Sequence, residues 1–129
     1  MRIIALHDLA SGMPGAFQYT RFAAALGKHA DSRIRLGFHG TSEQNIVPIT
    51  HEGLNPGMRK AVKFGVGDYF AERIDVALPY SQGARRMLVF AILMEESGLV
   101  YHGRDMIVIN KVEHEVPIIM IEFEHMGSL

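Results

Sequence analysis

The chain has 129 residues, which is enough for one domain with a hydrophobic core and too few for two domains of ordinary size. Hydrophobic residues make up 48% of it and the formal net charge is -1, so the composition is that of a globular protein and gives no overall field that would attract nucleic acid or an anionic membrane. The lack of cysteine excludes disulfides, a thiol nucleophile and a thiolate metal site.

The first residues, Met1 to Leu6, are mostly apolar, but polar residues follow at His7 and Asp8, too early for the apolar core of a signal peptide. No apolar run approaches the length of a membrane span. We therefore expect a cytoplasmic protein, or one domain of a larger protein, with no membrane partner.

The first half of the chain is expected to hold two helices with a strand between them. A proline suits the first turn of a helix and a glycine its end, so the near-helical recurrence of apolar residues predicts a helix at about 14–27. Alternating apolar residues predict a strand over 33–39, so that His39 stands at a strand end. A second helix is expected to follow, with Ser42 as its N-cap and Gly53 closing it in the left-handed conformation.

The second half is expected to be mainly strand. The segments predicted in chain order are a turn at 55–57, a loop leading to a short strand at 69–71, helical turns over 72–80, and strands over 87–94, 106–109 and 118–123. The eight apolar residues of 87–94 indicate a central strand that is buried on both faces. The total is an α+β domain built mainly of sheet.

Other common catalytic patterns are missing from the sequence. Seven histidines raise the question of a metal site. Four of them fall at no spacing that a zinc or di-iron site needs: His51, His102, His114 and His125. No serine, histidine and aspartate set has the local signature of a nucleophile elbow, and the glycines at 65 and 67 lack the third glycine and long helix of a dinucleotide motif. We therefore expect neither a metal site nor hydrolase chemistry.

Four separated features form the strongest functional signal. They are His39-Gly40-Thr41 at a strand end, the segment Gly65-Val66-Gly67-Asp68-Tyr69-Phe70-Ala71, Tyr80 eleven residues after Tyr69, and Asp105 at the start of a strand. This pattern resembles the catalytic domain of the poly(ADP-ribose) polymerase family. That family has a His-Gly-Thr on its first core strand, a Gly-x-Gly-x-Tyr-Phe-Ala segment, a second aromatic residue eleven positions later and an acidic residue opening a later strand. The stretch 52–57 also resembles the family's approach to the loop that covers the donor site, and the matches run over about 38–123, some two thirds of the chain.

The resemblance implies a single catalytic domain over 1–129, with a helical lead-in at 1–32 and an NAD-binding core over 33–129. Its fold would be the ADP-ribosyltransferase type of α+β fold, a split and mainly antiparallel β-sheet with short flanking helices. NAD+ would be the co-substrate, and no metal would take part.

The resemblance also implies a role for each matching residue. His39 would hydrogen-bond the adenosine ribose of NAD+, and the backbone of Gly40 would pair with the nicotinamide amide, which a residue without a Cβ allows. Tyr69 and Tyr80 would sandwich the nicotinamide ring. Asp105 would hold the nicotinamide ribose and stabilise the positive charge that develops as the glycosidic bond breaks. The implied catalytic set is Asp105, His39 and Tyr69, and the implied cofactor-binding set is His39, Gly40, Thr41, Tyr69, Phe70, Ala71 and Tyr80.

The chain departs from the family at two positions. Asp105 stands where many members have a glutamate, which keeps the charge but loses one methylene of reach, and this change favours transfer of a single ADP-ribose unit. Ala77 stands where members often have a serine, so one hydrogen bond to the nicotinamide carboxamide is missing, worth about 0.5–1.5 kcal/mol. Glu113 and Glu115 are the alternative carboxylates, although both are out of register with the motif.

The sequence therefore predicts an NAD+-dependent mono-ADP-ribosyltransferase. A protein side chain is expected as the acceptor, while a nucleic-acid acceptor and the oligomeric state stay open. One alternative is an inactive module that binds NAD+ or ADP-ribose, which the residues at 77 and 105 motivate. Another is an RNA-repair enzyme similar to the tRNA 2′-phosphotransferases, which share a His-Gly-Thr but lack the Tyr-Phe-Ala segment. Arg59, Lys60 and Lys63 form a basic loop that suits a pyrophosphate or a phosphate-bearing acceptor, although a solvated loop is the commoner meaning of such residues.

Overall fold

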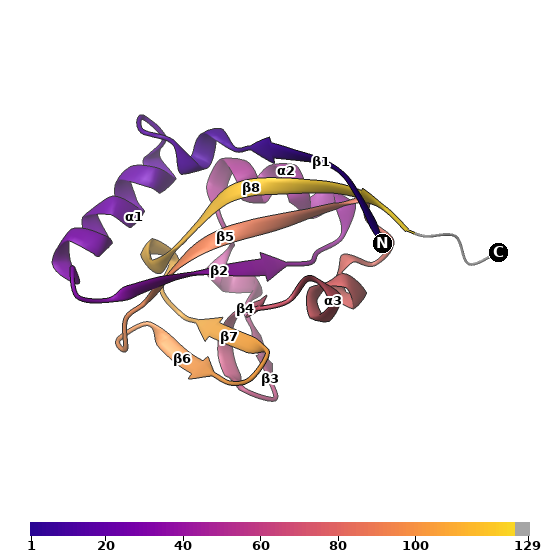
Figure 1. Cartoon of the computed structure of the whole chain (residues 1–129). Helices are drawn as coiled ribbons and strands as arrows, with labels where there is room; N and C mark the ends of the chain where they lie inside the picture. Colours follow the sequence, from indigo (N-terminus) through magenta and orange to yellow (C-terminus); the bar gives the residue numbers. More distant parts are fainter. Residues whose placement is uncertain (126–129) are drawn as a thin grey trace.

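The computed structural model describes residues 1–125, with the backbone alone for residues 60–62. Within this range the chain is an α+β domain with an antiparallel sheet and short helices (Figure 1). The strands are β1 (Arg2–Asp8), β2 (Arg33–His39), β3 (Lys60–Val62), β4 (Gly65–Ala71), β5 (Arg86–Met94), β6 (Leu99–His102), β7 (Met106–Ile109) and β8 (Glu115–Glu124). The α-helices are α1 (Phe17–Lys28), α2 (Glu43–Glu52) and α3 (Ile74–Ala77), and the 3-10 helices are η1 (Ala10–Gly12), η2 (Pro56–Met58), η3 (Leu78–Ser81) and η4 (Val112–His114).

The sheet is divided between β2 and β4. Its strands follow the order β1-β8-β5-β2-β4-β7-β6, and β3 pairs with β4 off this path. β2 pairs with β5 from Arg33 to His39, but its register with β4 is the single pair Phe38 and Ala71. The two strands diverge from this point, so β4, β7 and β6 form a second half of the sheet beside β1, β8, β5 and β2 (Figure 1). The expected split, antiparallel sheet is confirmed.

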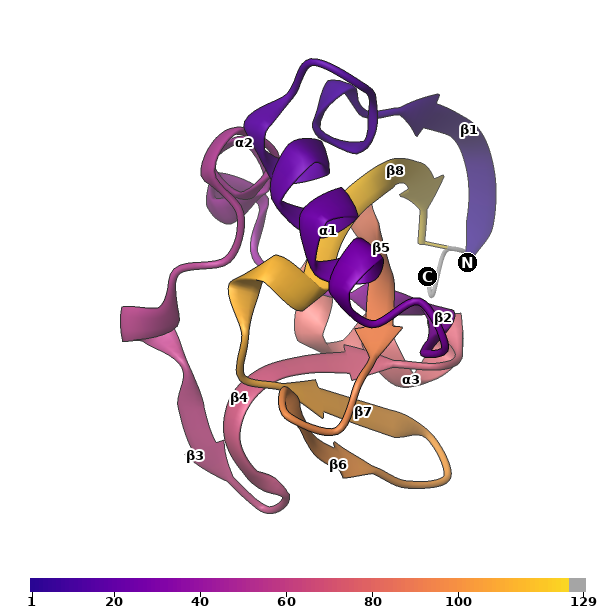
Figure 2. The same ribbon diagram turned by 90° about the vertical axis from the view of Figure 1, so that its left-hand side faces the viewer.

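β5 is an interior strand that buries both faces, as its apolar run predicts. Successive side chains of a strand point to opposite faces. Accordingly, Leu88 and Phe90 belong to the core cluster that α2 covers, whereas Met87 and Val89 belong to the cluster that includes α3. α1 lies over β5 and β8 (Figure 2). It covers a third part of the core, where Phe22 packs with Leu93 near the end of β5 and Val116 near the start of β8. The two faces of the sheet are therefore held by different helices.

Most helices and strands lie where the sequence predicts them. The helix expected at about 14–27 is α1, which begins three residues later. The strands expected over 33–39 and 106–109 are β2 and β7, and the helical turns expected over 72–80 are α3 and η3. In the range that the structure describes, no helix has the length and apolar character needed to cross a membrane.

The ends of α2 differ in detail from the expectation. Ser42 is the N-cap residue, but its side chain makes no capping hydrogen bond. Its hydroxyl instead accepts a hydrogen bond from Nδ2 of Asn45 at 3.0 Å. Gly53 ends the helix with φ 82° and ψ -177°, so φ is positive while ψ is extended, and the left-handed helical conformation is not formed.

Three strands lie where the sequence gives little signal. One of them, β1, lies within the expected helical lead-in over 1–32, so this segment contains a strand as well as α1. β1 pairs with β8 along its length, yet its side chains are mostly exposed on both faces, so no apolar alternation marks it. β6 has only four residues and β3 only three, too few for a periodic pattern. β3 and β4 form a hairpin, so Gly65 and Gly67 lie in a strand rather than in the predicted loop.

Candidate functional site

His39 is the last residue of β2, at the place where the sheet divides. Its Nδ1 lies 3.0 Å from the carbonyl oxygen of Tyr69 on β4. Since a carbonyl oxygen only accepts, this contact assigns the ring proton to Nδ1. The imidazole also packs against Phe70 and Phe90, with ring centroids 5.6 Å and 5.8 Å away. His39 is thus half-buried and fixed in orientation, and it connects the two halves of the sheet.

Gly40 follows at a point where the backbone of β2 meets the α3–η3 segment. A Cβ on Gly40 would lie 2.3 Å from the carbonyl oxygen of Ala77 and 3.1 Å from the backbone nitrogen and the hydroxyl of Ser81. Only glycine allows this approach, which places Tyr80, the residue before Ser81, beside the end of β2. Thr41 turns toward α2, and its hydroxyl accepts a hydrogen bond from Nδ2 of Asn45 at 3.0 Å.

The two tyrosines of the motif have different surroundings. Tyr69 is half-buried, and its hydroxyl donates to the carbonyl oxygen of Gly65 at 2.6 Å and accepts from the backbone N–H of Phe64 at 3.2 Å. It therefore holds the turn of the β3–β4 hairpin. Tyr80 lies on η3 with 57% of its surface exposed, so its ring is available to a ligand. Phe70 and Ala71 are buried in the core and support the site from within the sheet.

Asp105 lies directly before β7, where three strands meet in one row. Phe38, Ala71 and Met106 are paired across β2, β4 and β7, and Asp105 is one residue further along. Its carbonyl oxygen accepts a hydrogen bond from the N–H of Glu72 at 2.9 Å. The Asp105 side chain has no hydrogen bond or ion pair with any residue that the structure describes.

Glu72 is the neighbouring carboxylate that sequence reasoning missed. It binds Arg35 through one oxygen and His102 through the other, each at 2.8 Å. Glu72 directly follows the Tyr-Phe-Ala segment, so its place in the sequence could have marked it. The carboxylate of Glu72 is thus committed to two basic side chains, whereas the carboxylate of Asp105 has no partner among the described residues.

The basic loop is more fixed than its composition indicates. The Arg59 guanidinium donates to the carboxylate of the buried Asp68 from Nη2 at 3.2 Å and from Nε at 3.3 Å. Lys63 lies over the ring of Phe64 at 5.4 Å. The side chain of Lys60 lies outside the part that the structure describes. Lys63 is therefore exposed to solvent, whereas the side chain of Arg59 is mostly buried against Asp68.

The two alternative carboxylates lie away from Asp105, on η4 and at the start of β8. Glu113 is on η4 and half-buried. Glu115 begins β8 and is buried, and neither of its carboxyl oxygens has a hydrogen-bond partner among the described residues. Burial raises the pKa of Glu115 well above its ordinary value, and the nearby Asp68 carboxylate adds to this effect. Burial therefore favours the protonated form of this carboxyl group.

No protein-family model matches the chain, and no curated protein sequence matches it. Among solved structures it is similar to the PARP domain of Arabidopsis RADICAL-INDUCED CELL DEATH1. The TM-score is 0.75 at 14% sequence identity, over 96% of this chain and 88% of that one. This similarity shows the class of fold: the chain has the fold of a PARP domain.

Proposed function

We propose that the chain is an NAD+-dependent mono-ADP-ribosyltransferase, which cleaves the bond between nicotinamide and ribose and transfers ADP-ribose to a protein side chain. The observation that carries the proposal is the contact of His39 Nδ1 with the Tyr69 carbonyl oxygen at 3.0 Å, across the split of a PARP-type fold. This contact brings the two halves of the sequence motif to one place. Gly40 and the segment of Tyr80 adjoin the same place.

An unpaired polar atom beside Gly40 fits the carboxamide of NAD+. The hydroxyl of Ser81 is fully buried and has no hydrogen-bond partner among the described residues. Such a group costs about 1–3 kcal/mol unless a partner satisfies it. A carboxamide has both a donor and an acceptor that can do so. Ser81 would thereby take the role of the serine that is missing at position 77. A small movement of η3 would first have to expose the Ser81 hydroxyl.

The exposed ring of Tyr80 and the fixed ring of Tyr69 support binding of the nicotinamide. Aromatic stacking is worth about 0.5–1.5 kcal/mol beyond the area it buries. Because Tyr69 is held through its hydroxyl and His39 through its Nδ1, little side-chain entropy is lost when the donor binds. Donor binding then depends mainly on the position of Tyr80.

The free carboxylate of Asp105 suits the chemical step. As the glycosidic C–N bond breaks, nicotinamide leaves with the bonding electrons and positive charge develops on the ribose. A carboxylate without another partner can stabilise this charge, whereas Glu72 is committed to Arg35 and His102. The acceptor nucleophile then bonds to C1′ of the ribose and releases its proton to solvent. The shorter reach of aspartate favours transfer of one unit over chain elongation.

The test is nicotinamide release from NAD+ by the parent, Asp105→Ala and Asp105→Glu, followed by mass spectrometry of the modified protein. We expect release by the parent and a loss of at least about a hundredfold in Asp105→Ala, the usual scale of one electrostatic contact in a transition state. Asp105→Glu should keep activity, and the adduct should carry one ADP-ribose. Release that is unchanged in Asp105→Ala would remove the carboxylate from the mechanism.

A second candidate is an inactive module that binds NAD+ or ADP-ribose. The observation that favours it is Ala77, at the place where a serine would contact the donor, together with the coverage of Ser81. Saturable NAD+ binding without nicotinamide release by the parent would establish this second candidate.

A further inference from the structure

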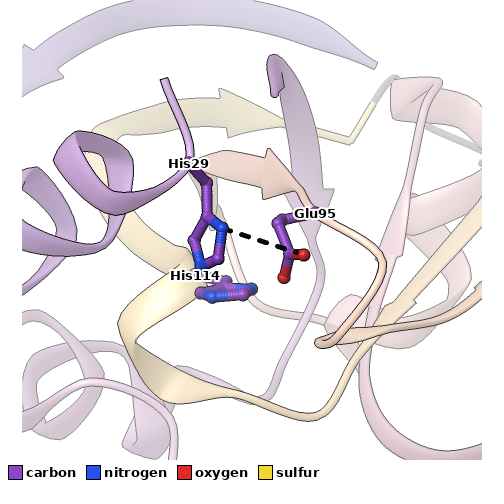
Figure 3. A group of neighbouring side chains, drawn as sticks. All are labelled: His29, Glu95 and His114. Carbon is purple, nitrogen blue, oxygen red and sulfur yellow. Dashed lines mark ion pairs between the residues drawn. The ribbon is translucent and has the colours of Figure 1, made fainter. Parts of the chain in front are cut away.

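Three ligand-type side chains from distant parts of the chain meet at one corner of the domain (Figure 3). His29 directly follows α1 as its C-cap residue, Glu95 directly follows β5, and His114 is the last residue of η4. The two imidazoles and the carboxylate each offer an atom, and these atoms all lie within 4.8 Å of one another. The arrangement is separate from the place where β2 and β4 divide.

The imidazole of His114 is buried and lies edge to face with the His29 ring, with the centroids 5.8 Å apart. It is 2% exposed, and its Nδ1 has no hydrogen-bond partner among the described residues. The backbone of Gly98 lies close to it, since a Cβ on Gly98 would be 2.5 Å from Nδ1. A buried ring nitrogen without a partner is costly, so a group that satisfies this ring would stabilise the domain.

The spacing of the other two ligands leaves room for an ion. Nδ1 of His29 lies 3.8 Å from Oε1 of Glu95, too far for a hydrogen bond. Two ligands of a tetrahedral zinc ion, at bond lengths of about 2.1 Å, lie roughly 3.4 Å apart. Small side-chain rotations would close the difference. Figure 3 shows the His29 ring and the Glu95 carboxylate facing each other, with the His114 ring next to both.

The carboxylate is already oriented for this role. Oε2 of Glu95 accepts hydrogen bonds from the backbone N–H of Ser97 at 3.0 Å and from the Ser97 hydroxyl. These contacts occupy one oxygen and leave Oε1 turned toward His29. Lys111 donates to the Ser97 hydroxyl at 3.0 Å. Its positive charge, together with those of Arg21 and Lys28 in the adjoining groove, lowers the expected affinity for a cation. Partners that orient a ligand in this way commonly change metal affinity by about 10–100-fold.

We propose that His29, Glu95 and His114 bind a divalent transition-metal ion, with zinc as the best match. Two imidazole nitrogens and one carboxylate oxygen are a ligand set that zinc accepts, and they leave its fourth position to water. A groove of about 520 Å³ beside the two histidines gives the ion a path from solvent. The ion would connect the end of α1 to η4 and to the turn after β5. This proposal does not depend on the proposed transferase activity.

The test is calorimetric titration of the untagged chain with zinc chloride, after removal of metals with EDTA and in a buffer without phosphate. We expect one zinc ion per chain, and a loss of affinity of at least about tenfold in His29→Ala and in Glu95→Gln. His29 is chosen because its side chain is one third exposed, so its removal should leave the fold intact. His51→Ala is the matched control, since this exposed histidine lies on α2 outside the cluster, and it should bind zinc as the parent does.

A thermal melt gives a second measurement that needs no activity. Zinc should raise the Tm of the parent and of His51→Ala, and should raise the Tm of His29→Ala and Glu95→Gln by clearly less at the same zinc concentration. The proposal is overturned if the parent shows no saturable zinc binding, or if both cluster variants bind zinc as tightly as the parent. Arg21, Lys28 and Lys111 also line the groove. Stabilisation by inorganic phosphate and not by zinc would therefore show an anion site and would also overturn the proposal.

Discussion

Replacing Gly40 by alanine would place a Cβ 2.3 Å from the Ala77 carbonyl oxygen and 3.1 Å from the backbone nitrogen of Ser81. Carbon atoms of this type approach no closer than 3.0 Å, so the carbonyl must move by about 0.7 Å. The obstacle is backbone, which cannot rotate away as the end of a side chain can. Either α3 and η3 move together, or the end of β2 bends.

This clash predicts a loss of about 1–3 kcal/mol in the free energy of unfolding, the usual cost of overpacking a core. At roughly 4 °C per kcal/mol for a domain of this size, Gly40→Ala should melt about 4–12 °C below the parent. Far-ultraviolet circular dichroism is the suitable probe, because the chain has no tryptophan. The same movement displaces Tyr80, so nicotinamide release by the folded variant should fall at least about tenfold.

Gly27→Ala is the matched control for this experiment. A Cβ on Gly27 would have no heavy atom within 4 Å, and the residue lies in α1. The same substitution there should stabilise the domain by about 0.5–1 kcal/mol, because alanine is the better helix former. If Gly40→Ala melts with the parent and keeps its nicotinamide release, the packing of α3 against β2 does not constrain the site.

The remaining predictions concern buried polar groups. The raised pKa of Glu115 means that the folded state binds the proton of this carboxyl group more tightly than the unfolded state does. The contribution of this group to the free energy of unfolding is therefore lost as the pH rises from 4.5 through the raised pKa. Glu115→Gln should therefore gain stability over the parent in urea unfolding, by about 1–3 kcal/mol near pH 8 and less near pH 5; an equal gain at both pH values would contradict the assignment. Arg59→Ala removes the cation beside the buried Asp68 and should cost about 3 kcal/mol in the same assay, whereas a cost under about 1 kcal/mol would mean that solvent reaches this pair. Ser81→Ala should leave stability equal or higher, yet weaken NAD+ binding by about 0.5–1.5 kcal/mol by calorimetry; lost stability with unchanged affinity would remove Ser81 from the site.

The parts of the fold that could be predicted are those whose burial leaves a periodic trace. The run in β5 is apolar throughout because helices cover both of its faces, and α1 is regular because it packs on one side. β1 could not be predicted in this way, since it joins the sheet through its backbone while Ile3 and Leu6 stay 48% and 63% exposed. Strands at the edge of a sheet carry less of the hydrophobic signal.

The candidate site, like the fold, could be predicted only in part from the sequence. The motif residues could be identified because each lies in a short local pattern, and the structure brings His39 and Tyr69 into contact. The other polar residues near the site could not be predicted. Glu72 pairs with a residue far away in the sequence, and tertiary packing leaves the Ser81 hydroxyl without a hydrogen-bond partner among the described residues. His29, Glu95 and His114 are far apart in the sequence and form no recognisable metal-binding motif. These residues meet because the end of α1, the turn after β5 and η4 lie together at one corner of the domain.

The most direct test of the central claim is a calorimetric titration with an NAD+ analogue whose nicotinamide link cannot be cleaved. The parent, Tyr80→Ala and Phe17→Ala would be compared, since Tyr80 and Phe17 are aromatic residues of nearly equal exposure, 57% and 56%. A donor site at the end of β2 predicts one analogue per chain, affinity about threefold to tenfold weaker in Tyr80→Ala, and no change in Phe17→Ala. A parent that does not saturate, or a Tyr80→Ala variant that binds as tightly as the parent, would contradict the assignment of this site.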